Sequence, residues 1–164
     1  MVGSSSNSIR PTALSIELSQ HSTSPPTLRA TVRNNHSKIL TILTWDTPLD
    51  EKAAILGVFR VTEKSSGDEV EMGGIKINRL LPPPRDAFVE LSPGAESSKD
   101  FELKEPLWPM EKGHRYYIKA VGDWKAVWEA RVGDLTDGDF KDMAASERAI
   151  KIETYESEPI EVEI

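Results

Sequence analysis

Apolar and polar residues alternate in three separate stretches of this 164-residue chain, the period-two pattern of a β-strand with one buried face. In TLRATVRN, Leu28, Ala30 and Val32 alternate with charged or hydroxyl-bearing side chains. The stretches TALSIEL (12–18) and EPIEVEI (158–164) repeat the pattern near the two ends of the sequence. A strand of this kind buries its apolar face only against a second layer, so the pattern predicts a layered β fold.

Other strand-like segments follow at intervals of roughly ten residues with turn signals between them, the spacing of a β-sandwich. We therefore predict an all-β chain with an immunoglobulin-like antiparallel β-sandwich of about 8–9 strands. The remaining candidate strands are ILTILTW (39–45), ILGVFRVTE (55–63), VEM with IKINRL (70–80), AFVEL (87–91), KDFEL (99–103), RYYIKAV (115–121) and RAIKIET (148–154).

Several segments interrupt the strands. SSGD (65–68) has the composition of a hairpin turn, and the glycine pair at 73–74 suits a bulge in the returning strand. Three successive prolines exclude LPPPRD (81–86) from a central strand, because each removes a backbone donor. WKAVWEA (124–130) fits either a strand or a helical turn, and one short helix is expected near 139–147.

The composition is that of a soluble globular protein, with residues 12–164 as a single domain and residues 1–11 as a disordered tail or cloning scar. Twenty basic residues are scattered among 27 acidic ones, for a net charge of -7, so neither nucleic acid nor a membrane surface is an expected partner. No cysteine is present, which excludes disulfides and a thiol nucleophile, and no cofactor is expected.

MVGSSSNSIRPT lacks the apolar centre of a secretory leader, and together with the missing cysteines this predicts a cytoplasmic protein. The alternative is a secreted protein whose leader has been removed. Asn35-His36-Ser37 is a formal N-glycosylation acceptor that a cytoplasmic protein would leave unused.

Six stretches, taken in their order, carry a resemblance that spans most of residues 12–125. They resemble the N-terminal non-catalytic domain, or pro-domain, of deuterolysin-type fungal zinc endopeptidases and the free-standing relatives of that domain. The stretches are ATVRNN, LTWDTPLD, GVFRV, GGIKINRL, AFVELSPGAE and GHRYYIKAVGDW.

The resemblance implies an immunoglobulin-like fold and a role in binding or holding another polypeptide. It does not imply catalysis, because the peptidase half of that family carries an HExxH zinc motif. Here His21, His36 and His114 stand in the contexts HSTS, HSKI and HRYY, with no acidic neighbour. A GxSxG elbow and a glycine-rich phosphate loop are also missing from the sequence, so we expect no enzyme activity.

RVGDLTDGDFKD (131–142) is the stretch that most resembles a calcium loop. The EF-hand pattern places glycine sixth, and with Gly138 there the first and third positions are Gly133 and Leu135, which offer no side-chain oxygen. Starting from Asp134 instead puts Ala145 twelfth, where glutamate is needed. Asp134, Asp137 and Asp139 remain weak candidates for an irregular calcium site, against a polar turn with helix-capping aspartates.

Two further stretches carry candidate side chains for binding or acid–base chemistry. TWDTPLDE holds Asp46, Asp50 and Glu51, which fit either a pair of carboxylates for acid–base work or a strand end with Asp50 capping a turn. EPLWPMEKGH (105–114) gives the candidate binding residues Trp108, Met110 and His114. Of the four tryptophans we expect Trp108 to be the exposed one, whereas Trp124 and Trp128 should face the core together, and Trp45 suits the core better than a sugar platform.

These observations predict a non-catalytic protein-binding module whose partner is another protein, among which a protease is one option. Two alternatives stay open: an inhibitor or folding helper of a deuterolysin-like metalloendopeptidase, and a carbohydrate-binding module that uses an exposed tryptophan.

Overall fold

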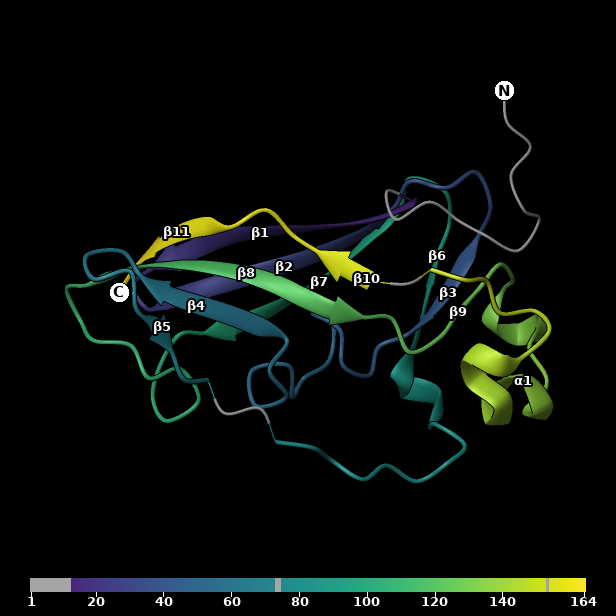
Figure 1. Cartoon of the computed structure of the whole chain (residues 1–164). Helices are drawn as coiled ribbons and strands as arrows, with labels where there is room; N and C mark the ends of the chain where they lie inside the picture. The colour runs from purple at the N-terminus through teal and green to yellow at the C-terminus, as the bar shows by residue number, and fades with distance from the viewer. Residues whose placement is uncertain (1–12, 73–74, 153) are drawn as a thin grey trace.

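The computed structural model describes residues 13–72, 75–152 and 154–164, and in this part of the chain eleven strands form antiparallel pairs (Figure 1). One α-helix, α1, covers Asp137–Asp142. The strands are β1 (Leu14–Thr23), β2 (Pro26–Asn34), β3 (Leu40–Leu43), β4 (Phe59–Glu63), β5 (Glu69–Val70), β6 (Phe88–Leu91), β7 (Glu96–Glu102), β8 (Arg115–Asp123), β9 (Val127–Trp128), β10 (Thr154–Glu156) and β11 (Ile160–Glu163).

Two sheets make the layers of a β-sandwich. One has the order β1-β2-β7; in the other β8 pairs with β4, β10 and β11, and β5 extends the β4 edge. The alternation read from the sequence decides which side is buried: Leu28, Ala30 and Val32 of β2 are fully buried and pack in one core with Ile118 and Ala120 of β8. The predicted antiparallel sandwich is therefore confirmed.

A third sheet, of order β6-β3-β9, lies at one end of the molecule beside α1 (Figure 1). Its strands contribute to the main core and to a second apolar cluster that includes Trp128, Phe88 and Phe140. Trp124 and Trp128 both face the interior as predicted, with 7% and 0% of their surface exposed. Trp45 is half-buried against the second cluster.

The irregular segments differ more from expectation. The predicted helix near 139–147 is present as α1 followed by a 3-10 turn at Met143–Ala145. Residues 75–80, expected to return as a strand, have no regular structure, because their backbone pairs with no sheet apart from one bond between Ile75 N and Ile55 O. WKAVWEA contains the short strand β9. The expected tail at 1–11 and the bulge at 73–74 lie outside the described residues.

Candidate binding site

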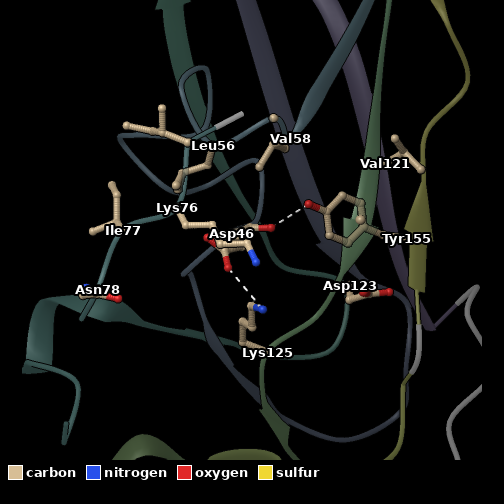
Figure 2. Close-up of a pocket in the computed structure, with 13 residues that line it drawn as sticks. Asp46, Leu56, Val58, Lys76, Ile77, Asn78, Val121, Asp123, Lys125 and Tyr155 are labelled. Atoms are coloured by element: carbon tan, nitrogen blue, oxygen red, sulfur yellow. Dashed lines mark hydrogen bonds and ion pairs between the residues drawn. The ribbon is translucent and has the colours of Figure 1, made fainter. Parts of the chain in front are cut away.

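A pocket of about 480 Å³ opens where the turn after β3, the irregular residues 75–78, the end of β8 and β10 meet (Figure 2). Its polar lining comes from Asp46, Lys76, Asn78, Asp123 and Lys125, and its apolar lining from residues such as Leu56 and Ile77. Two carboxylates and two ammonium groups balance in charge, so the pocket suits a polar, uncharged or zwitterionic group.

The backbone conformation of Asp46 shapes one wall of the pocket. Asp46 has a φ of 59°, a left-handed conformation that is uncommon outside glycine. Its carbonyl oxygen accepts a 2.6 Å hydrogen bond from the Tyr155 hydroxyl, and its carboxylate lies 3.3 Å from Lys125 Nζ (Figure 2). Burial, with smaller contributions from nearby aspartates led by Asp46, raises the pKa of Tyr155, so the hydroxyl remains a donor.

Tyr155 reaches Asp46 by crossing a glycine. In the β10–β8 ladder Tyr155 pairs with Gly122, and a Cβ placed on Gly122 would lie 2.5 Å from the Tyr155 hydroxyl oxygen. No real Cβ contact is that short, so the ring position requires glycine at 122. Trp124 supports the other side of the ring, with centroids 5.1 Å apart.

Asp50 fixes the turn that carries Asp46. Its buried carboxylate accepts backbone N–H bonds from Asp46 at 2.9 Å and Lys52 at 2.9 Å, as expected of a capping aspartate. It also accepts a 2.7 Å bond from Arg79, whose guanidinium lies 4.8 Å from the centroid of the Trp45 ring. Because Arg79 belongs to the irregular segment, these contacts tie residues 75–84 to the sandwich.

Beside this pocket lies a mainly apolar groove of about 360 Å³, with Ile55, Glu71, Met72 and Ile75 on one side and the 105–109 loop on the other. Ile75 borders both hollows, and Leu107, Pro106 and Pro109 line the far side of the groove. Among the described residues five large apolar side chains are exposed, and four of them are Ile75, Leu80, Leu81 and Leu107. We call residues 75–81 and 105–109 the loop pair.

The predicted exposure of Trp108 is wrong. Only 1% of its surface is exposed, because the indole packs in the main core. Its ring centroid lies 5.3 Å from that of Phe59 and 6.2 Å from that of Phe101. Met110 is buried as well, and the neighbouring Leu107 is the residue that faces solvent. A sugar platform at Trp108 is therefore excluded by its position.

The described residues gather three possible metal ligands, Glu63, Glu111 and His114, within 4.8 Å of one another. Both imidazole nitrogens already face carboxylates, Nδ1 at 2.6 Å from Glu63 and Nε2 at 3.2 Å from Glu111. The hydrogen bond with Glu63 raises the pKa of His114 and lowers that of Glu63. We call this arrangement of His114 between two carboxylates the His114 clamp. His114 is half-buried, whereas Trp108 and Met110 are buried in the core.

The three calcium candidates do not form such a group in the described part of the chain. Asp139 is buried, and its carboxylate accepts bonds from Thr136 N at 2.8 Å and Ser146 Oγ at 2.6 Å. Thr136 and Asp139 form a capping box at the start of α1. Asp134 and Asp137 are exposed. Asp139 is therefore a helix-capping residue, as the alternative to a calcium site predicts.

Tyr117 is an exposed aromatic residue that the sequence pattern did not predict. Tyr117 is 38% exposed on the outer face of β8, in a hollow of about 540 Å³ that Arg60, Lys119 and Pro159 also line. Its neighbours Tyr116 and Ile118 point into the core. The only signal was the alternation itself, which in RYYIKAV is masked by bulky residues on both faces.

Two comparisons with known proteins bear on this geometry. A family model described as an immunoglobulin-like domain matches residues 13–164. An uncharacterized secreted protein of Arthroderma benhamiae is 42% identical over 125 residues, which cover 74% of this chain and 63% of that protein. The chain thus aligns with less than two thirds of its relative's length.

The relative corrects one expectation. The relative is described as secreted, so the prediction of a cytoplasmic protein is wrong. The absence of cysteines is a poor guide to the compartment here, because a core of this size needs no disulfide to fold. Among the described residues no helix is long and apolar enough to span a membrane.

Proposed function

Because the chain belongs to the family of immunoglobulin-like domains, we propose that it is a non-catalytic module that binds another protein outside the cell. The location follows the description of its relative in Arthroderma benhamiae as a secreted protein. The proposed binding role rests on apolar side chains that remain exposed to solvent in the folded protein.

The observation that carries the proposal is that four of the five large apolar side chains exposed among the described residues belong to the loop pair. Isolated exposed leucines are ordinary, but Ile75 and Leu107, 55% and 49% exposed, line one groove. Leu80 and Leu81 add exposed apolar surface further along the segment that begins at Ile75. The charged pocket lies directly beside the groove and shares Ile75. An apolar centre with a polar margin is the usual composition of a protein interface.

The anchoring of the segment supports the same role. The Arg79–Asp50 contact and the Ile75–Ile55 backbone bond hold the segment without placing it in a sheet. A partner would therefore meet a surface that is partly ordered in advance, which lowers the entropy cost of binding. Inhibition or assistance of a deuterolysin-like endopeptidase is a narrower form of this proposal.

The test compares two exposed-site variants. The chain carrying both Ile75→Ser and Leu107→Ser is used beside wild type to capture proteins from the medium of the source culture, with Tyr117→Ser as the matched control. We expect one or more proteins to bind wild type and the control but to be lost with the double variant. Equal capture by all three would refute the loop pair as the interface.

The outer-face hollow supports a second candidate, binding of a carbohydrate at Tyr117. An exposed phenol ring can stack on a sugar ring, while Arg60 and Lys119 provide hydrogen-bond donors and Glu69 an acceptor at its margin. Binding of neutral oligosaccharides, measured by calorimetry, should then be lost in Tyr117→Ser and kept in the Ile75/Leu107 double variant. Absence of binding to wild type would remove this candidate alone.

A further inference from the structure

The turn between β2 and β3 carries Asn35-His36-Ser37, the only Asn-X-Ser/Thr triplet in the sequence. This triplet, with any residue but proline in the middle, is the acceptor that N-linked glycosylation requires. Residues 35–38 have no helix or strand structure, and Asn35 and Ser37 are both exposed. The acceptor therefore lies on a solvent-facing turn.

The two adjacent asparagines have different surroundings. Asn34 is fully buried, and its side-chain nitrogen donates to the carbonyls of Lys38 at 2.9 Å and Leu91 at 2.8 Å. Its side-chain oxygen accepts the backbone N–H of His36 at 2.8 Å. These three bonds shape the turn and direct the chain outward at Asn35, so Asn34 is structural and Asn35 is presented to solvent.

The Asn35 side chain makes hydrogen bonds at the protein surface. Nδ2 donates to Ser15 Oγ at 2.9 Å, and Oδ1 accepts from Arg33 Nε at 3.0 Å. A primary amide carries two N–H hydrogens, and glycosylation replaces one of them. Both contacts are at exposed positions, where water can substitute for them.

We propose that Asn35 is an N-glycosylation site of this protein, an inference that depends on the secretory route assigned under the proposed function. The Asn35 amide nitrogen attacks the anomeric carbon of a lipid-pyrophosphate-linked oligosaccharide. The nitrogen–carbon bond forms as the carbon–oxygen bond to pyrophosphate breaks, the lipid pyrophosphate leaves, and the amide loses one proton.

The position of the turn fits the proposed interface. The β2–β3 connection lies at the upper right of Figure 1, whereas residues 75–84 run along the lower edge. A glycan at Asn35 would cover the end of the sandwich near β1 and leave the loop pair open to a protein partner. Modification and binding therefore occupy separate parts of the surface.

The test uses the protein recovered from the source culture medium and the full chain expressed behind a secretory leader in a eukaryotic host. Intact mass is measured before and after digestion by peptide-N-glycosidase in heavy-oxygen water, which converts a glycosylated asparagine to labelled aspartate. We expect a mass loss and labelled Asp at position 35. Asn35→Gln and Ser37→Ala should abolish both, Ser37→Thr should keep them, and Asn78→Gln should change neither.

The outcomes separate this inference from the secretion on which it depends. Protein found in the medium with Asn35 unmodified would overturn the glycosylation site and leave secretion standing. Native protein absent from the medium would overturn secretion, and in that case the leader-bearing chain still decides: an unmodified Asn35 there shows that the turn is not an acceptor. Protein carrying the glycan in both preparations supports both statements.

Discussion

Gly122 is the residue on which the shape of the pocket depends most directly. Its place opposite Tyr155 lets the phenol ring cross the β8 backbone and reach the Asp46 carbonyl. The requirement is steric, because the Tyr155 hydroxyl and ring carbon Cζ would lie 2.5 and 2.8 Å from an added Cβ.

Gly122→Ala should therefore displace the Tyr155 ring and break its hydrogen bond to Asp46. We expect a loss of about 1–3 kcal/mol in the free energy of unfolding, the usual cost of inserting a methyl group into a packed site. Urea unfolding measures it. Gly133→Ala is the control, since nothing lies within 4 Å of its added Cβ. Equal stability of the two variants would contradict the steric role of Gly122.

A second prediction for a single residue concerns His114 and its contacts with Glu63 and Glu111. Hydrogen bonding to Glu63 raises the pKa of His114 above 6.5, so its stabilising effect is present below that pH and is lost as pH rises through the folded-state pKa. The same bond lowers the pKa of Glu63 below 4.5, so the contribution of Glu63 is present above that value and is lost as pH falls through the folded-state pKa.

The clamp should therefore stabilise the protein most between pH 4.5 and 6.5, the ordinary pKa values of the two groups. Thermal melts of wild type and His114→Gln across pH 3–9 measure this. The difference in melting temperature should be largest inside that window and small in size, because solvent reaches both side chains and screens the pair. A difference that is constant with pH would show that the ion pair contributes nothing.

At the scale of elements, α1 is short and depends on its first turn. Six residues form a helix too short to be stable alone, so capping and tertiary contacts must hold it. Asp139 provides much of this, because its carboxylate bonds Thr136 at the N-cap and Ser146 beyond the helix. Phe140 in the same helix packs against Phe88, with the two ring centroids 4.8 Å apart.

Asp139→Ala should remove these bonds and leave the buried Ser146 hydroxyl without its acceptor. The expected loss is about 1–3 kcal/mol, the range for a lost cap and a buried unsatisfied group. Asp142→Ala, an exposed change at the end of the same helix, should stay within about 0.5 kcal/mol of wild type in chemical unfolding. Similar losses in both variants would mean that helix charge, and not capping, is what matters.

The segment at 75–84 is held differently, by the Arg79 side chain together with one backbone hydrogen bond from Ile75 to Ile55. Arg79→Ala would leave the buried Asp50 carboxylate with only its two backbone donors. Since the Arg79 side chain is 19% exposed, we expect a loss of about 2 kcal/mol, less than the ~3–5 kcal/mol of a fully buried pair. Limited proteolysis should cut the variant within residues 76–85 much faster than wild type or the exposed-site control Arg85→Ala.

Across the whole molecule, sequence predicts the sandwich better than it predicts the site. Period-two alternation identified β1, β2 and β11 because one face of each is buried and the other solvated. The same reasoning failed at IKINRL, whose apolar residues alternate although no strand pairs with them, and at Trp108, whose burial depends on Phe59 and Phe101 from distant strands. Exposure in loops is a tertiary property.

The pocket was beyond sequence reasoning for a related reason. Asp46, Lys76, Gly122, Lys125 and Tyr155 come from four separate segments, and none of them belongs to a spaced motif. In the sequence Asp46 and Asp50 fit a carboxylate pair, but the structure gives Asp50 an arginine partner and two backbone donors. Only the fold shows that Asp50 organises the turn that presents Asp46.

The bond from Tyr155 to Asp46 joins residues 109 positions apart, which has a consequence for the order of events during synthesis. A ribosome releases the β3 turn long before it has translated β10, so the nascent chain can pair β4 with β8 while the pocket still lacks one wall. A partner that needs the pocket could not engage the growing polypeptide. Binding would wait until β10 had left the exit tunnel.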